Sequence, residues 1–347
     1  MLRVHLAAAE AAAIEAVCDE LAQRYDTVES AEFQQESRVY AEELPRRIRS
    51  ALHDFRSSER SAAFVLSGFP VPDDKIGPTP RHWADKPVPS PTLRQDIAFF
   101  LIASVLGEPI GWATQQDGYI MHDVFPIKGH EHEQIGFGSA ELLTWHTEDA
   151  FHPLRTDYLG LMCLRNPDKV ETTLADVADV KIDDATRRIL TQERFYILPD
   201  NSHRQREGEE VDNTEAVPAD DRVAALRRRS RRQVERALSA PEPVAVLFGD
   251  AESPYLRIDP YYMADAQGDE EQAALDTVGE AIDAAMTGVT LEPGDICLID
   301  NYRAVHGRKP FRARFDGTDR WLRRLNVTRD LRKSRGSRLD ARSRVIY

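Results

Sequence analysis

Two histidines and one glutamate stand out in this sequence because their types and spacing suit a metal ion. His146 and Glu148 are separated by one residue, in Leu-Thr-Trp-His-Thr-Glu-Asp-Ala-Phe. In a β-strand, side chains at i and i+2 point to the same face, so this imidazole and this carboxylate would enter one cavity. His306 follows the apolar run at 296–299, which would deliver it from another core strand. Two histidines and one carboxylate are the facial set that binds Fe(II) and leaves coordination positions open.

An arginine-rich segment follows His306 and could serve a second ligand of the metal. Arg320 and Arg324 lie in Asp-Arg-Trp-Leu-Arg-Arg and would share one face of a strand. The Asp-Gly in 315–319 predicts a hairpin that would pair this strand with the strand of His306. A guanidinium that holds a carboxylate with two hydrogen bonds is what a 2-oxoacid cosubstrate needs. The alternative is a solvated basic strand, and we favour it for the arginines beyond Arg329.

Two other motifs resemble functional sites but favour simpler interpretations. His130-Glu-His-Glu133 places two histidines at i and i+2, yet no third ligand is positioned by spacing, so we interpret it as a turn or an outer layer of a site. His122 is interpreted as an ordinary strand residue. The run 227–232, Arg-Arg-Arg-Ser-Arg-Arg, is flanked by acidic residues and predicts a solvated helix face rather than a nucleic-acid patch. The sequence has no Gly-rich phosphate loop and no Gly-x-Ser-x-Gly elbow.

The composition is that of an acidic globular protein. The 347 residues are 41% hydrophobic and 30% charged, with a formal net charge of −14. This charge argues against general nucleic-acid binding, which needs a basic surface, and leaves room for an acidic pocket that takes a cationic substrate. Cys18, Cys163 and Cys297 are far apart and odd in number, so they indicate neither a disulfide framework nor a zinc site, and a reducing cytoplasm is expected.

The N-terminus predicts an amphipathic helix rather than a targeting segment. Its first residues are apolar, but Glu10, Glu15 and Asp19 interrupt any signal-peptide core. No uncharged run approaches the ~20 residues of a membrane span, so no membrane association is expected.

The first part of the chain, up to Gly111, is predicted to be mostly helical. Apolar periodicity predicts helices over 7–25, 42–56 and 92–106. Residues 62–68 form a short apolar run that ends at Gly and Pro, and they predict a buried strand. The proline-rich stretch 70–91 is expected to wrap the surface as a loop.

The chain beyond Gly111 is predicted to be mainly β. Short apolar runs separated by turn signals are typical of a sandwich or barrel of the jelly-roll kind. The predicted strands cover 119–126, 142–145, 158–164, 195–198, 244–248, 255–258, 296–299 and 322–328. Helices are expected over 219–239 and 268–288, the second with an apolar stripe that includes Ala273, Val278 and Ile282.

No linker divides the chain, so we predict one domain over residues 1–347. It would be mainly β with helical elaborations, built on a distorted double-stranded β-helix (jelly roll) core. Residues 1–110 would form a mostly helical part that packs on this core. The polar composition of 200–220 predicts a long loop, and we expect 199–240 to form a lid or insert over the site.

With these motifs in view, the chain resembles the clavaminate-synthase-like non-haem Fe(II)/2-oxoglutarate oxygenases. The segments that carry the resemblance extend beyond the metal motif and include Gly-Trp-Ala-Thr-Gln-Gln-Asp at 111–117, Leu-Arg-Asn-Pro-Asp at 164–168 and Asn-Val-Thr-Arg-Asp-Leu at 326–331. Within this family the chain is similar to the free L-arginine hydroxylases of viomycin and streptothricin biosynthesis, and to the enduracididine hydroxylases. The resemblance implies a jelly-roll core, Fe(II), 2-oxoglutarate as cosubstrate and O₂.

The resemblance also implies roles for individual residues. His146, Glu148 and His306 would hold the iron. Arg320 would pair with the distal carboxylate of 2-oxoglutarate, and Thr173 would also contact this cosubstrate. The implied substrate contacts are Gln115 and Glu148 to the α-amino group, Arg324 to the carboxylate, and Asp200 and Asp259 to the guanidinium. A cationic substrate fits such acidic residues, because a buried guanidinium needs paired carboxylates.

The expected reaction is hydroxylation of free L-arginine at C3, with C4 as a further position, in a non-ribosomal peptide antibiotic pathway. Tyr261 stands where the viomycin-type enzyme has an acidic residue, so enduracididine, citrulline or another basic amino acid is the alternative substrate. Two other classes stay open. A zinc-dependent hydrolase could use the same three ligands but has no need of Arg320, and a binding protein could keep the fold without a metal. The sequence does not predict the oligomeric state.

Overall fold

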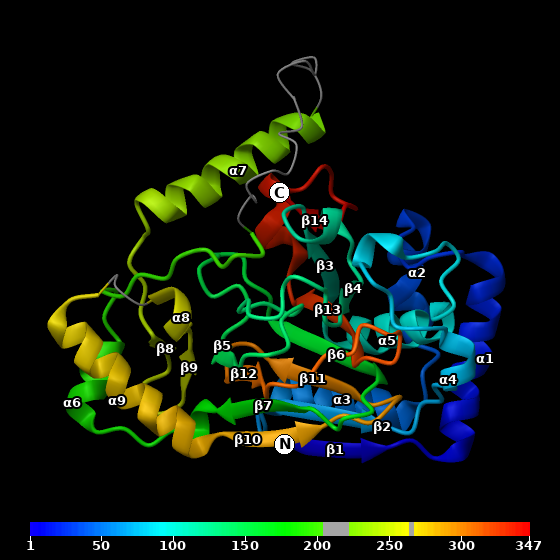
Figure 1. The fold of residues 1–347 in the computed structure, drawn as a ribbon, viewed down its shortest axis with the longest axis horizontal. Helices are drawn as coiled ribbons and strands as arrows, with labels where there is room; N and C mark the ends of the chain where they lie inside the picture. Colours follow the sequence, from blue (N-terminus) through cyan, green and yellow to red (C-terminus); the bar gives the residue numbers. More distant parts are fainter. Residues whose placement is uncertain (204–221, 264–266) are drawn as a thin grey trace.

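A computed structural model describes residues 1–203, 222–263 and 267–347, and it shows two β-sheets flanked by helices (Figure 1). The larger sheet has eight strands, in the order β1 (Leu2–His5), β2 (Ala63–Ser67), β11 (Ile296–Asp300), β6 (Tyr158–Arg165), β13 (Trp321–Thr328), β3 (Glu108–Trp112) and β14 (Val345–Ile346), with β4 (His122–Val124) also paired to β13. The smaller sheet has four strands, in the order β10 (Thr287–Thr290), β7 (Glu171–Asp176), β12 (Ala304–Arg308) and β5 (Leu143–His146). A separate pair joins β8 (Leu247–Gly249) to β9 (Pro254–Leu256).

The two larger sheets enclose an apolar core between their facing surfaces. Leu161 of β6 and Leu322 of β13, from the larger sheet, belong to one buried cluster with Leu174 of β7 and Ala304 of β12, from the smaller sheet. Side chains alternate between the two faces of a strand, so every second residue of these strands points into the space between the sheets.

Helices cover the outer face of the larger sheet. They are α1 (Ala8–Arg24), α2 (Ala31–Ala41), α3 (Arg46–Ser58) and α5 (Leu93–Leu106), which share one buried cluster with strands of that sheet. Helix α5 is buried at every position except Arg94, which agrees with its almost wholly apolar sequence. The short α4 (Asp73–Ile76) lies in the proline-rich stretch.

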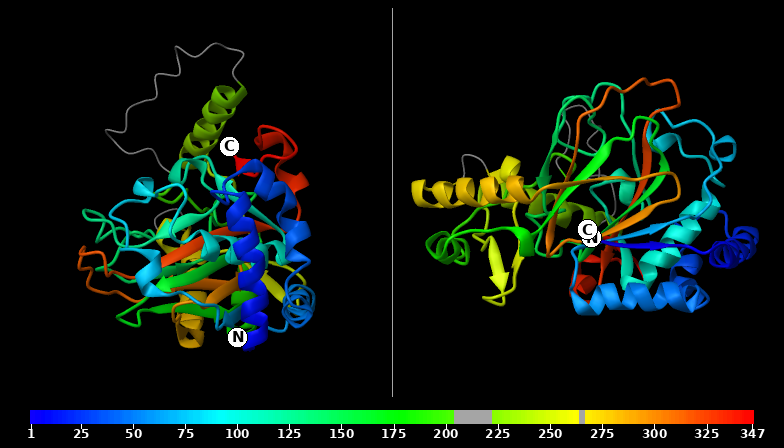
Figure 2. Two further views of the ribbon diagram at one scale, coloured as in Figure 1. Left: turned by 90° about the vertical axis from the view of Figure 1, so that its right-hand side faces the viewer. Right: turned by 90° about the horizontal axis from the view of Figure 1, so that it is seen from below.

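The outer face of the smaller sheet is covered by α6 (Asp184–Leu190) and α9 (Asp269–Ala285), which Figures 1 and 2 place at the opposite end of the molecule from α1. Val278 and Ile282 of α9 are fully buried in a cluster that also holds Val305 of β12. Helices α7 (Arg222–Ser239) and α8 (Pro260–Met263) follow the polar stretch and the β8–β9 pair, respectively.

The structure confirms most of the predicted elements and corrects others. A helix at 31–41 was not predicted, because its sequence is polar and its main signal is the Ser30 side chain that caps Phe33 N. The predicted strand at 195–198 is only a single bridge from Phe195 to Val244. In the predicted stripe of α9, Val278 and Ile282 are buried, but Ala273 is exposed and the neighbouring Ala274 is buried in its place. Residues 204–221, most of the predicted loop, lie outside the described residues.

The predicted hairpin between the strand of His306 and the strand of Arg324 is wrong. Strand β12 pairs with β7 and β5 in the smaller sheet, whereas β13 pairs with β6, β3 and β4 in the larger one. Residues 309–320 therefore carry the chain from one sheet to the other. No helix in the described part of the chain is both long and apolar enough to cross a membrane.

Candidate active site

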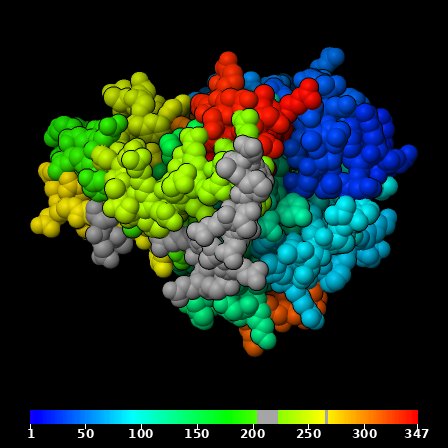
Figure 3. All heavy atoms as spheres, turned by 90° about the horizontal axis from the view of Figure 1, so that it is seen from above, coloured from blue at the N-terminus to red at the C-terminus, as the bar shows by residue number. Residues whose placement is uncertain are grey.

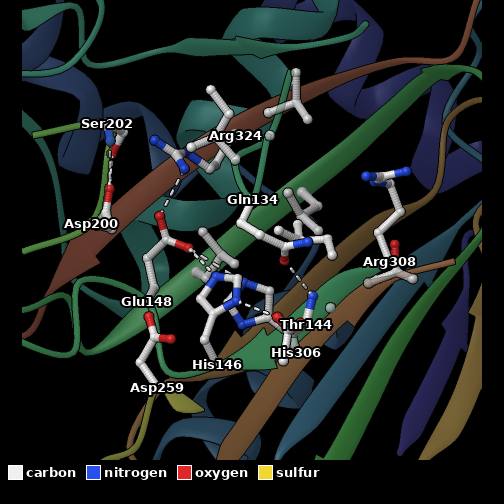
Figure 4. A pocket seen from close by; sticks show the side chains of 18 of the residues that line it. Gln134, Thr144, His146, Glu148, Asp200, Ser202, Asp259, His306, Arg308 and Arg324 are labelled. Carbon is white, nitrogen blue, oxygen red and sulfur yellow. Dashed lines mark hydrogen bonds and ion pairs between the residues drawn. The ribbon is translucent and has the colours of Figure 1, made fainter. Parts of the chain in front are cut away.

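The two histidines and the glutamate meet in a cavity between the two sheets (Figure 4). His146 ends β5 and stands directly opposite His306 of β12 in the strand register. Glu148 lies in the turn after β5 rather than in the strand, yet its Oε2 is 3.7 Å from His146 Nε2 and 3.3 Å from His306 Nε2. The three side chains offer ligand atoms that all lie within 4.8 Å of one another. This donor set and its spacing fit one metal ion.

Neighbouring residues orient these three side chains. His146 donates from Nδ1 to the carbonyl oxygen of Thr144 at 2.8 Å, so its Nε2 lone pair faces the cavity. The main chain of Glu148 is held by the side chain of Asn301, which is fully buried. The Glu148 carboxylate accepts a hydrogen bond from Arg324 at 2.7 Å through Oε1, and its Oε2 points to the histidines. The ligand atoms are therefore positioned by the protein itself.

Charge within the site favours an anionic Glu148. Burial alone would raise the pKa of Glu148, but Arg324 and the two imidazoles hold it well below its ordinary value. Burial would also lower the pKa of His146, but the hydrogen bond to Glu148 and the charge of Asp259 outweigh it and raise the pKa to about 9. The pKa of His306 is lowered by burial and by His146. Protons and a metal cation therefore compete for the same atoms.

Two buried arginines form one side of the cavity, and neither is paired with a carboxylate of the described residues. Arg320 makes one hydrogen bond there, from Nη2 to Thr172 Oγ1 at 3.3 Å, and its Nε has no partner. Burial lowers the pKa of Arg320 to about 10. Arg308 bonds only to main-chain carbonyl oxygens, and burial together with Arg320 lowers its pKa to about 9. Two buried guanidinium groups without a counterion fit an anionic ligand such as a carboxylate.

The structure does not bring Thr173 into this cavity. On β7, Thr172 and Leu174 face the space between the sheets, so the alternation of the strand turns Thr173 to the opposite face. Its hydroxyl occupies the space beside Gly307, where an added Cβ would lie 3.0 Å from Thr173 Oγ1. Thr172, which was not predicted, is the threonine that lines the cavity and contacts Arg320.

The opposite side of the cavity is acidic. In Figure 4, Asp200, Glu148 and Asp259 lie on one side of the histidine pair and Arg308 on the other. Burial, reinforced by the charge of Asp200, raises the pKa of Asp259 to about 6. Tyr261 also lines the cavity and is 52% exposed, which places it at the mouth.

Arg324 contacts both a metal ligand, Glu148, and a predicted substrate residue, Gln115. Besides Glu148, its guanidinium donates to Gln115 Oε1 at 2.8 Å and to His122 Nδ1 at 2.7 Å. The amide nitrogen of Gln115 in turn donates to Ser202 Oγ at 2.7 Å. The structure therefore brings together all the predicted substrate residues, although Gln115 reaches the cavity through Arg324 and is not itself in its lining.

Several residues of the site were not found from the sequence. No role was predicted for Asn301 or His203. His122, interpreted as an ordinary strand residue, does lie on β4 but also binds Arg324. Asp149 accepts hydrogen bonds from Trp112 Nε1 at 2.7 Å and from His203 Nε2 at 2.8 Å. Only its position next to Glu148 could have drawn attention to it.

The competing histidine motif proves to be a turn, as interpreted. His130 bonds to Glu133 and His132 bonds to Glu141, each at 2.8 Å, and neither histidine belongs to a metal-like cluster of the described residues.

Comparisons with known proteins agree with this geometry. Residues 95–326 match the family described as "Taurine catabolism dioxygenase TauD, TfdA family". The chain is 66% identical to an enduracididine beta-hydroxylase of Streptomyces hygroscopicus and 45% identical to an L-ornithine/L-arginine 3-hydroxylase of Catenulispora acidiphila, over 100% of each chain. It is also similar to the crystal structure of the non-heme iron oxygenase OrfP in complex with Fe, succinate and (3S)-hydroxy-L-Arg, with a TM-score of 0.89 and 36% identity over 100% of both chains. The chain therefore belongs to the TauD/TfdA family of dioxygenases.

Proposed function

We propose that this protein is an Fe(II)- and 2-oxoglutarate-dependent oxygenase that hydroxylates a free guanidino amino acid at C3. The observation that carries the proposal is the layout of one cavity. A two-histidine, one-glutamate cluster lies between two buried arginines that lack a counterion and a pair of aspartates. The first feature suits iron, the second suits the cosubstrate carboxylate, and the third suits a cationic side chain.

His146, Glu148 and His306 are proposed to hold the iron. Arg320, assisted by Arg308 and Thr172, is proposed to hold the distal carboxylate of 2-oxoglutarate. When bound, iron and 2-oxoglutarate supply the O₂-dependent chemistry that side chains lack, in which one oxygen atom enters the substrate and the other enters succinate, with loss of CO₂. The succinate in the OrfP complex is consistent with this stoichiometry. A zinc-dependent hydrolase would leave the two buried arginines without a role.

The amino acid is proposed to bind by both of its ends. Arg324 would hold the α-carboxylate, with Glu148 and Gln115 at the α-amino group, while Asp200 and Asp259 would pair with the guanidinium. Because the α-carbon substituents are anchored beside Glu148, the first side-chain carbon that reaches the triad is C3. The names of the two relatives, a beta-hydroxylase and a 3-hydroxylase, support the same carbon.

L-Arginine and enduracididine are the two candidate substrates. The ornithine/arginine relative and the OrfP complex favour L-arginine, whereas the higher identity to the enduracididine enzyme favours the cyclic guanidine. Citrulline carries no side-chain charge, so the aspartate pair argues against it.

We also assign the two facing sheets to a distorted double-stranded β-helix core within one domain over residues 1–347. Within it, 1–110 would form the mostly helical part, and the described residues 199–203 and 222–240 would belong to the cover of the site. Antibiotic biosynthesis is the inferred context. The three free, buried cysteines favour a cytoplasmic location.

The test measures succinate formation by the Fe(II)-loaded protein with L-arginine, enduracididine, citrulline, L-lysine and no amino acid. The expected result is stimulation by one or both guanidino amino acids, with a product 16 mass units heavier and hydroxylated at C3. His146→Ala is expected to abolish turnover. Zinc-dependent hydrolysis, or no succinate with any guanidino amino acid, would overturn the proposal.

A further inference from the structure

A second cavity, of about 750 Å³, lies behind the active site and beneath helix α7. Ser230, Val234 and Ala237 of α7 form one side of it, and the C-terminal Tyr347 also lines it. Figure 3 shows α7 lying beside the C-terminal segment, to which Arg229 donates a hydrogen bond at Gly336 O. The size is in the range of cavities that bind small organic molecules.

The floor of this cavity contains a buried guanidinium that has no anionic partner. Arg155 is 7% exposed, and no carboxylate of the described residues forms an ion pair with it. Its guanidinium packs over the rings of Tyr302, at 4.5 Å, and Phe248, at 5.2 Å. Its Nε is buried without a hydrogen-bond partner. The two ring contacts fix the plane of the guanidinium, so its position is set before any ligand arrives.

Two further donors lie beside Arg155. Among the residues that the structure describes, Arg257 donates to two neutral oxygens, those of Ala150 and Phe151, at 2.6 and 3.0 Å. Arg257 lines the same cavity as Arg155. Burial, and then the charge of Arg155, lower the pKa of Arg257 to about 10.

The third donor is His152. Its Nδ1 accepts a hydrogen bond from Leu154 N at 3.0 Å, so its proton is on Nε2. Burial lowers the pKa of His152 to about 3, which keeps the ring neutral. The cavity floor therefore offers two cations and one neutral N–H donor.

We propose that this cavity is a second ligand site, which binds the oxyanion of a small organic molecule, a carboxylate or a phosphate monoester, between Arg155 and Arg257. Arg155 is buried and Arg257 is half-buried, and among the described residues no carboxylate pairs with either, so an anion placed between them would be stabilised by both guanidinium groups. The acidic lining residues Glu193 and Glu242 are exposed and form no ion pair with either arginine. Trp112, Phe151 and Phe248 supply apolar walls for the rest of the molecule.

The site lies on the reverse side of the turn that carries Glu148. Trp112 lines this cavity, packs against His152 with ring centroids 4.4 Å apart in a tilted arrangement, and donates to Asp149. Arg257 donates to the carbonyl oxygens of Ala150 and Phe151, the two residues that follow Asp149 in the same turn. A bound anion would thus contact the segment next to the active site without entering it.

Calorimetric titrations test the proposal on the protein loaded with Fe(II) and saturating 2-oxoglutarate without oxygen, and again without these additions, so that the outcome does not depend on the proposed activity. The probes are inorganic phosphate, phenyl phosphate and 4-bromobenzoate. We expect saturable binding of at least one probe at one site per chain. Phosphate esters and carboxylates are distinguished by which probe binds more tightly.

Two variants and a crystal structure locate the site. Arg155→Met keeps the apolar stem and removes the charge, and it should weaken binding at least tenfold. Arg232→Met makes the same charge change at an exposed position of α7 outside the cavity, and it should change the affinity for the probe by less than twofold. In wild-type crystals soaked with 4-bromobenzoate, the anomalous bromine peak should lie in the cavity of Arg155. No saturable binding of any probe, equal binding by Arg155→Met, or a bromine peak only beside Arg320 would overturn the proposal.

Discussion

The side-chain amide of Asn301 holds the main chain of Glu148 from both sides. Its Oδ1 accepts a hydrogen bond from Glu148 N at 2.8 Å, and its Nδ2 donates to Glu148 O at 3.0 Å and to Thr156 O at 2.9 Å. Asn301 is fully buried, so water cannot replace these bonds. The residue that carries the carboxylate of the triad is therefore fixed by a side chain that does not itself enter the cavity.

Replacing Asn301 by alanine should weaken iron binding about 10- to 100-fold, the range found when residues behind metal ligands are changed. The measurement is Fe(II) titration without oxygen. Asn166→Ala is a matched control, because Asn166 holds Val170 N and O and Leu291 O in the same way, far from the cavity. Both variants should lose stability, but only Asn301→Ala should lose iron affinity. Equal iron affinities would contradict the positioning role.

Arg320→Met should raise the KM for 2-oxoglutarate about 100-fold, because removing one partner of a buried charge pair costs about 2–5 kcal/mol. The ligand-free protein should not lose thermal stability, since the buried charge that is removed has no counterion. Arg324→Met is the comparison. It should raise the KM for the amino acid and destabilise the protein, because Glu148, Gln115 and His122 lose a partner. Identical kinetic effects of the two changes would refute the assignment.

Thr172→Val and Thr173→Val form a pair that tests the register of β7. Each keeps the volume and removes one hydroxyl. Thr172→Val removes the one oxygen that Arg320 contacts, and it should raise the KM for 2-oxoglutarate by about 5- to 10-fold, equivalent to about 1 kcal/mol. Thr173→Val should change the KM for 2-oxoglutarate by less than twofold. The reverse pattern would restore Thr173 as the contact that family resemblance implies.

Asp259→Asn should raise the KM for the guanidino amino acid about 10- to 100-fold, because a hydrogen bond to a charged group contributes about 1.5–3 kcal/mol. The KM for 2-oxoglutarate should not change, since Arg320 and Arg308 lie on the other side of the cavity. Steady-state kinetics with each substrate varied in turn gives both constants. An unchanged amino-acid KM would place the guanidinium elsewhere.

Because of the titration of Asp300, the free energy of unfolding should fall as pH rises. Burial raises its pKa from 3.8 to about 6, so the folded protein favours the neutral carboxyl. The stabilisation by the bound proton is complete below the unfolded pKa and is lost as pH rises through the folded pKa. A rise of the pKa from 3.8 to about 6 is equivalent to about 3 kcal/mol.

Asp300→Asn, which stays neutral, should therefore raise the melting temperature more at pH 8 than at pH 4. The oxygen that accepts from Tyr302 N is kept in this variant. A pH-independent difference between variant and wild type would show that folding does not raise the pKa of Asp300.

The metal cluster could be predicted from sequence because its signal is local. His146 and Glu148 are two residues apart, and the core run before His306 places the third ligand. The route of the chain could not be predicted, because the Asp-Gly turn in 315–319 is equally compatible with a hairpin and with a crossing between sheets. Arg324 on β13 and Arg320, just before this strand, both still line the cavity.

The residues that support the cluster were invisible in the sequence for a different reason. Asn301 lies 153 positions from Glu148, and its amide acts only through distances that folding creates. Thr172 and Thr173 are adjacent and chemically identical, so only the strand register decides which one faces Arg320. Buried polar partners of this kind are specified by tertiary structure rather than by local pattern.

The origin of each group in the site also bears on how the protein can change over evolutionary time. The iron-binding histidines are anchored in the smaller sheet and Arg324 in the larger one, so their spacing depends on the whole core. Asp200, Ser202, Asp259 and Tyr261 belong to connecting segments outside both sheets. Mutations in these segments can exchange one amino acid for another as the preferred substrate while leaving the oxidation machinery intact. Substitutions in the part of the cavity that the sheets form should therefore be tolerated less well than substitutions in the connecting segments.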